Sequence, residues 1–154
     1  MADSNVVPLS HNALSLYNQI CKPVCKELDI GQTAFDILML LGTRPELTTA
    51  RDIVQQGGIK KNLVSMNVEK LVDQGYLDRQ PIPGDRRQVK LVLTGKAAPV
   101  IEKGRWVQQY YYNYLIRGLT PEEMAVYRKC TETMSANMEE LSRLLTEAER
   151  NTIL

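Results

Sequence analysis

The stretch Gly75–Thr94, GYLDRQPIPGDRRQVKLVLT, decides the fold of this chain. It predicts two extended segments, Tyr76–Gln80 and Gln88–Leu93, and in the second one apolar and polar side chains alternate as in a half-buried strand. Two prolines and a glycine lie between them and favour a turn. The stretch therefore predicts a β-hairpin. Its charged tip and base carry Asp85, Arg86, Arg87 and Arg79.

A pair of helices is predicted directly before the hairpin. Thr48 or Thr49 can cap a short helix that has Asp52 in its first turn and ends at Gly57–Gly58. A second helix, about Lys61–Gln74, has one apolar stripe and a polar opposite face. The stripe consists of Val64, Val68, Leu71 and Val72. This is the sequence form of a helix-turn-helix, and with an arginine-tipped hairpin behind it the arrangement suits duplex DNA.

Candidate DNA contacts lie on the second of these helices and along the hairpin. Asparagine can read adenine, serine can contact a phosphate or a base edge, and Met66 can touch a thymine methyl group. The ordinary alternative is a solvated helix face and solvated loop charges. The candidates are Lys60, Lys61, Asn62, Ser65, Met66, Lys70, Arg79, Asp85, Arg86, Arg87 and Lys90.

Charge is unevenly distributed along the chain. The net charge is +1, but residues 60–96 hold eight basic and four acidic side chains, a local +4. Residues 120–154 hold four basic and seven acidic ones, a local −3. A basic middle and an acidic tail fit a protein that docks one face on phosphates.

Four further helices are predicted around this centre. The first runs from an N-cap at Ser10 to about Leu28, and Pro23 should kink or interrupt it. Thr33–Leu41 is apolar on most sides and therefore central to the core. A long helix, about Gly95–Arg117, follows the hairpin. The last starts with a capping box at Thr120–Glu123, and its apolar seam requires a partner helix. The seam consists of Met124, Tyr127, Cys130, Met134, Met138, Leu141 and Leu145.

Composition excludes several classes of protein. The 154 residues, 44% hydrophobic and 24% charged, indicate one globular domain, or one domain with a dimerisation extension. No apolar run reaches the ~20 residues of a membrane helix, and the N-terminus does not resemble a secretory signal. Three cysteines without metal-ligand spacing favour reduced thiols in a cytoplasm. No catalytic, metal-binding or cofactor motif is recognisable, so we expect neither an enzyme nor a bound cofactor.

The order of these elements closely resembles the MarR family of bacterial transcription regulators. The resemblance covers nearly the whole chain and is most specific in Leu63–Ala97, LVSMNVEKLVDQGYLDRQPIPGDRRQVKLVLTGKA. This segment is similar to the family's recognition helix, its "L…G…R" junction, its wing "D-x-R" and its closing "LT..G". The chain departs from the family's pattern at Gly57, Lys60, Met66 and Ala97. Gly57 replaces an aliphatic residue, Lys60 a small polar cap, Met66 a basic residue and Ala97 a glycine.

The resemblance implies a mainly α fold with a β-hairpin wing. It implies one MarR-like domain over 1–154, with a winged helix-turn-helix lobe at about 30–96 and dimerisation helices at about 9–29 and 97–154. The homodimer would bind a pseudo-palindromic operator and act as a repressor released by a small ligand or an oxidant. Arg87 would enter the minor groove, held by Asp85, where a narrow groove concentrates negative potential.

The family also implies a site for a small aromatic or anionic effector between the dimerisation helices and the DNA-binding lobe. Candidates for it are His11, Tyr17, Trp106, Tyr110 and Tyr111. For each aromatic residue, packing at a helix–helix interface is the stronger alternative. Some members sense oxidants through thiols, which makes Cys21, Cys25 and Cys130 redox candidates; buried structural cysteine is favoured over this.

Two rival functions remain open at this point. The chain could be a winged-helix module that binds proteins without an operator, or an accessory domain of an enzyme. The basic wing speaks against the first, and the complete C-terminal helices without a cofactor motif speak against the second.

Overall fold

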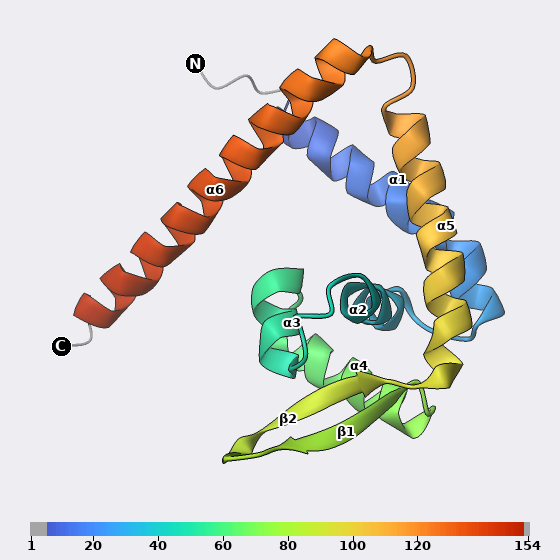
Figure 1. Cartoon of the computed structure of the whole chain (residues 1–154), viewed down its shortest axis with the longest axis vertical. Coiled ribbons are helices and arrows are strands. Elements are labelled where there is room, and N and C mark those ends of the chain that lie inside the picture. Colours follow the sequence, from blue (N-terminus) through green and yellow to red (C-terminus); the bar gives the residue numbers. More distant parts are fainter. Residues whose placement is uncertain (1–5, 153–154) are drawn as a thin grey trace. The chain divides into compact units, whose positions relative to one another are not determined.

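The computed structural model describes the backbone of residues 6–152 and the side chains of residues 12–84 and 88–148. The chain forms two compact units, Met1–Tyr112 and Asn113–Leu154. The first holds a helical lobe with one antiparallel hairpin, and the second consists mainly of one long helix (Figure 1). The predicted class, mainly α with a small β-hairpin wing, is confirmed.

Most elements belong to the first unit. In chain order the elements are α1 (Val6–Glu27), α2 (Gln32–Thr43), α3 (Ala50–Gly57), α4 (Lys61–Asp73), β1 (Leu77–Ile82), β2 (Asp85–Leu93), a 3-10 turn (Gly95–Ala97), α5 (Ala98–Leu115) and α6 (Pro121–Thr152).

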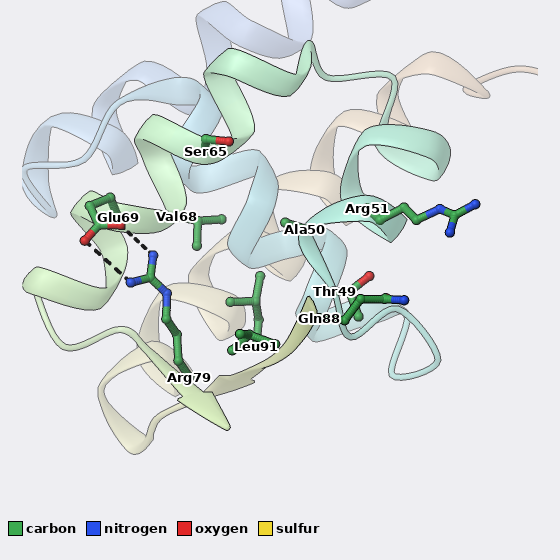
Figure 2. A pocket seen from close by; sticks show the side chains of 10 residues that line it. Thr49, Ala50, Arg51, Ser65, Val68, Glu69, Arg79, Gln88 and Leu91 are labelled. Atoms are coloured by element: carbon green, nitrogen blue, oxygen red, sulfur yellow. Dashed lines mark hydrogen bonds and ion pairs between the residues drawn. The ribbon is translucent and has the colours of Figure 1, made fainter. Parts of the chain in front are cut away.

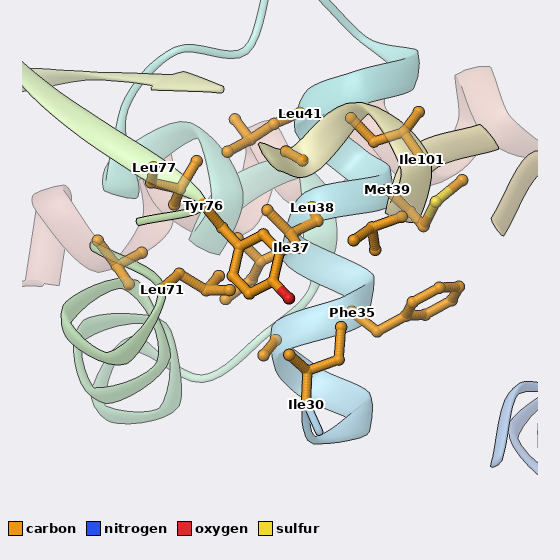
Figure 3. Packing of buried hydrophobic residues seen from close by; sticks show 14 of the residues in the cluster. Ile30, Phe35, Ile37, Leu38, Met39, Leu41, Leu71, Tyr76, Leu77 and Ile101 are labelled. Carbon is orange, nitrogen blue, oxygen red and sulfur yellow. The ribbon is translucent and has the colours of Figure 1, made fainter. Parts of the chain in front are cut away.

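The core of the lobe is built around α2. Phe35, Ile37 and Leu38 of this helix are completely buried, as its apolar residues on most sides predict (Figure 3). Buried residues of α1, α3, α4, α5 and both strands complete the core, among them Leu71 and Leu77. α5 approaches α2 closely because Gly104 has no side chain, and a Cβ there would clash with Met39.

The helix-turn-helix has well-defined ends. Thr49 caps α3: the Asp52 N–H donates to Thr49 Oγ1 at 3.2 Å, and Asp52 Oδ2 accepts from the N–H groups of Thr48 and Thr49 at 2.9 and 2.8 Å. Partial burial opposes ionisation, but these N–H donors hold the pKa of Asp52 below its ordinary value. α3 closes at Gly58, which has a φ of 63°. The predicted capping of this helix is confirmed.

The hairpin is longer than predicted. Pro81 and Ile82 belong to β1, and Asp85–Arg87 belong to β2, which leaves only Pro83 and Gly84 between the strands. The predicted loop from Pro81 was therefore wrong. A proline is tolerated because β1 is an edge strand and the register shifts beside it, from Pro81–Val89 to Ile82–Asp85. β2 has three residues between these pairs where β1 has none, which is a bulge.

The outer helices correct two further predictions. α1 begins at Val6, before the predicted cap at Ser10, and it continues through Pro23 to Glu27. Proline removes one N–H from a helix but does not have to end it when the surrounding turns are packed. The capping box at the start of α6 is confirmed, because Thr120 N–H donates to Glu123 Oε2 at 2.8 Å and Glu123 N–H donates to Thr120 Oγ1 at 3.2 Å.

Within the described residues, no helix is both long enough and apolar enough to cross a lipid bilayer.

Candidate nucleic-acid interface

The outer face of α4 collects most of the predicted DNA contacts. Val64, Val68 and Leu71 turn inward and are buried, so the residues between them point away from the core. Asn62, Ser65, Met66 and Lys70 are exposed, with 61% of Met66 accessible. The spacing of 62, 65, 66 and 70 places them on one side of the helix. The structure therefore brings these four predicted residues together.

Two lysines stand at the start of α4. Lys60 directly precedes the helix, its side chain does not cap it, and both Lys60 and Lys61 are exposed. The first N–H groups of a helix carry partial positive charge, so they and these ammonium groups give one end of α4 a cationic character.

Arg79 links the hairpin to α4. Its guanidinium donates to both oxygens of Glu69, with Nη2–Oε2 at 2.6 Å and Nη1–Oε1 at 3.5 Å (Figure 2). The hydrogen bond from Arg79 holds the pKa of Glu69 below its ordinary value. Both side chains are largely exposed, so the pair contributes little to stability. It nevertheless holds a carboxylate and a guanidinium at a fixed place beside the exposed face of α4.

The hairpin is also tied to α3. Lys90 of β2 pairs with Thr49 in an isolated bridge, and the Leu91 N–H donates to Thr48 O at 2.7 Å. The start of α3, the outer face of α4 and the hairpin thus form one body.

A groove of about 340 Å³ lies where these three elements meet (Figure 2). Ser65 and Glu69 line it from α4, Arg79 and Gln88 from the hairpin, and Arg51 from α3. Figure 2 shows Arg51 extending outward from α3. Arg51 was not predicted from the sequence, because nothing along the chain places the first turn of α3 beside the hairpin.

The side chains of Asp85, Arg86 and Arg87 lie outside the described residues, and so does that of His11. The roles predicted for them stay predictions.

Comparison with known proteins agrees with this geometry. The sequence model of the MarR family matches residues 28–88, which span the helix-turn-helix and most of the hairpin. Residues 28–88 therefore match the MarR family in sequence, and the chain has the winged-helix fold of MarR proteins. A MarR protein from Peptoclostridium difficile has the same fold, with a TM-score of 0.78, 24% identity and coverage of 91% of each chain.

Two further solved structures share this fold. A mutant MarR from E. coli complexed with operator DNA matches with a TM-score of 0.66 and 22% identity, over 85% of this chain and 94% of that one. The DNA binding of Bordetella bronchiseptica BpsR is regulated by 6-hydroxynicotinic acid. BpsR matches with a TM-score of 0.67 and 21% identity, over 86% of this chain and 99% of that one.

The winged-helix lobe also contains a cavity of about 290 Å³ beneath α1. Tyr17 lines it, and the Gln108 amide donates to the Tyr17 hydroxyl at 3.1 Å. Tyr111 packs edge-on against Tyr17, with ring centroids 5.6 Å apart, and donates to Ala13 O at 2.8 Å. Burial raises the pKa of Tyr17 well above its ordinary value. Of the predicted effector residues, the structure brings Tyr17 and Tyr111 together.

Trp106 and Tyr110 lie elsewhere. Their rings stack on each other 5.6 Å apart and are 68% and 51% exposed. Neither lines the cavity.

The cysteine pair sits in the core. Cys21 is completely buried, Cys25 is nearly so, and burial raises the pKa of both thiols, that of Cys25 to about 11. Such thiols stay protonated at neutral pH, which favours the structural interpretation. Cys130 is exposed on α6. A redox role for any of the three stays a prediction.

The described residues of the second unit leave the predicted seam of α6 uncovered. Met134, Met138, Leu141 and Leu145 are between 53% and 63% exposed. A helix with an uncovered apolar stripe is typical of an interface with a second chain.

Proposed function

We propose that this MarR-family transcriptional regulator is a homodimer that binds a pseudo-palindromic DNA operator, represses transcription by doing so, and is released by a small ligand. The observation that carries the proposal is the single body formed by the exposed face of α4, the start of α3 and the hairpin.

That body supplies the groups that duplex DNA requires. Asn62 and Ser65 can read base edges in the major groove, and Met66 offers an apolar surface to a thymine methyl group. Lys60, Lys61 and the outward-pointing Arg51 flank the face and can take phosphates. Arg87 is proposed to enter the minor groove beside it. The E. coli protein complexed with operator DNA, which shares the fold, supports this use of the lobe.

The proposal of a homodimer rests on α6. Its exposed seam repeats at the spacing of a helix that packs against another helix, and a second copy of the chain offers the same surface. Two-fold symmetry then places two α4 helices on one side of the duplex. Half-site centres about one helical turn, ~10 bp, apart follow from this.

Release by a ligand would use the cavity beneath α1. A ligand that binds one spacing of the two lobes better than the other shifts the population toward that spacing. BpsR, whose DNA binding is regulated by 6-hydroxynicotinic acid, supports this part of the proposal by its fold.

Fluorescence anisotropy tests DNA binding directly. The full chain is titrated against labelled fragments from upstream of its own gene. The titration is repeated at several salt concentrations from about 50 to about 200 mM, because DNA affinity depends on salt over this range. We expect tight binding to one fragment and a fall in affinity of at least about 100-fold over that range. Absence of binding to every fragment at low salt would leave a protein-binding or enzyme-accessory module.

A further inference from the structure

The cavity beneath α1 is lined by apolar, polar and acidic side chains, without a basic one among the described residues. Leu14 of α1, Met39 and Leu40 of α2, and Ile59 supply apolar walls. The polar lining comes from Tyr17, Asn18, Asp36, Thr43 and Gln108. Asp36 is the one charged group among the described residues that line the cavity, and none of them is basic.

The carboxyl group of Asp36 has few hydrogen-bond partners to offset its burial. Gln32 Nε2 donates to Asp36 Oδ1 at 2.8 Å, and this is its only hydrogen bond within the described part of the chain. The residue is half-buried, and burial raises the pKa of its carboxyl above the ordinary value. The ionised form of such a carboxyl is stabilised when a hydrogen-bond donor or a cation approaches its second oxygen.

The cavity depends on a missing side chain. Gly57, the last residue of α3, lies in its wall, and a Cβ built there would come 2.9 Å from Leu40 Cδ2. A larger residue would push Leu40 into the space. Gly57 is not needed for a left-handed backbone, a conformation that its neighbour Gly58 adopts instead.

Aromatic carboxylates fit this lining poorly. Their charge would face the Asp36 carboxyl, with no basic partner among the described lining residues to offset the repulsion. An amidinium or a protonated nitrogen heterocycle would instead be attracted to the Asp36 carboxylate and could donate charge-assisted hydrogen bonds to it.

We propose that the cavity between α1, α2 and α5 binds a small organic cation with N–H donors, anchored by Asp36, and that it discriminates against anions. The proposal replaces the anionic effector expected from sequence and is compatible with an aromatic one. Only the link from binding to release from DNA rests on the proposed function, because ligand binding can be measured without DNA.

The test uses three probes of matched size: benzamidinium, benzamide and benzoate, which carry one positive, no and one negative charge. Isothermal titration of the full chain is expected to rank them in that order, with benzamidinium at least about 10-fold tighter than benzoate, a factor that corresponds to about 1.4 kcal/mol. Asp36→Asn should remove the advantage of benzamidinium over benzamide.

Two further variants distinguish the effect of the Asp36 charge on binding from the effect of cavity volume. Asp29→Asn removes the same charge outside the cavity, at a turn residue whose φ of 51° suits asparagine, and should leave the ranking unchanged. Gly57→Ala narrows the cavity and should weaken benzamidinium and benzamide by a similar factor.

Three results would overturn the inference: binding of benzoate equal to that of benzamidinium, an Asp36→Asn variant that keeps the preference for the cation, or no binding of any probe. If the chain still binds its promoter fragment, only this inference fails. Failure to bind DNA overturns the proposed function whatever the probes do.

Discussion

α4 and α6 are both helices with one apolar side, but this side is buried in α4 and exposed in α6. In α4 the apolar side is buried by the lobe, with Val64 and Leu71 at 1% and 0% exposure, and the polar side faces outward. In α6 the apolar side itself faces outward, and Met138 is 63% exposed. The winged-helix lobe contains the core that holds α4 in place, whereas the described residues of the unit of α6 form no comparable core.

This difference separates two roles. A helix anchored on its apolar side can present polar groups to DNA in a fixed geometry. A helix with a bare apolar side gains stability only when a partner covers it. Substitutions on the two helices should therefore have different effects.

The largest effect is expected at the α6 seam. Leu141→Asp puts a charge on the apolar stripe and should convert the protein to a monomer at micromolar concentration, measured by light scattering after size exclusion. Operator affinity should fall at least about 100-fold, because the two half-sites are no longer bound together.

Ala136→Asp is the matched control. It adds the same charge on the opposite side of α6, given 3.6 residues per turn. It should leave mass and affinity unchanged. A Leu141→Asp variant that stays dimeric would place the interface elsewhere.

The two sides of α4 should respond differently to truncation. Leu71→Ala removes a completely buried side chain and should cost about 2–5 kcal/mol in the free energy of unfolding. Met66→Ala should change it by less than about 0.5 kcal/mol, because the side chain is exposed. Urea denaturation measures both. Equal losses would mean that the outer face of α4 is packed against something.

At the wing, Arg87→Ala should cost roughly 1–3 kcal/mol of DNA-binding free energy without changing the thermal midpoint. Fluorescence anisotropy on the operator measures the loss. Arg143→Ala, which removes an arginine from α6, serves as control. An unchanged affinity in Arg87→Ala would remove this residue from the interface.

A smaller effect of opposite sign is expected at the base of the hairpin. Glu69→Gln removes a negative charge beside the exposed face of α4 and frees Arg79 for phosphates, so DNA should bind a few-fold tighter and depend more steeply on salt. The thermal midpoint should hardly move, because the pair is exposed. Glu140→Gln on α6 is the control, and weaker binding by Glu69→Gln would show that the pair itself positions α4.

The smallest effect concerns Asp36, the one acidic residue in α2. Burial raises its folded-state pKa, so the folded state holds the proton more tightly than the unfolded state does, and this carboxyl costs stability increasingly as the pH rises above its ordinary pKa of about 3.9. Asp36→Asn should therefore melt higher than the parent at pH 7 and equally at pH 3.5. Thermal melts across this range measure the difference, and a lower midpoint for the variant at pH 7 would contradict the burial effect.

Local signals in the sequence predicted much of this fold. The caps at Thr49 and Thr120, the glycine after α4 and the apolar stripes act over a few residues, and each produced the expected helix. The hairpin ends were missed because the place of Pro81 on an edge strand with a bulge is decided by pairing across the sheet. Likewise, Pro23 does not end α1.

Sites that join distant segments were the hardest to predict. Tyr17 was predicted to contact an effector, but Asp36 and Gln108, which line the same cavity, were not singled out, because α1, α2 and α5 meet only in the folded lobe. One signal was present: Asp36 is the one carboxylate in a mainly apolar helix. Trp106 and Tyr110, predicted for the same site, do not line this cavity, and crowding of aromatic residues in one helix does not reveal which of them face a cavity.

Hydroxyl-radical footprinting of the bound promoter fragment tests most directly whether paired α4 helices dock on DNA. The account predicts two protected patches related by two-fold symmetry, with centres about 10 bp apart. A single patch, or protection that persists unchanged in the monomeric Leu141→Asp variant, would contradict it.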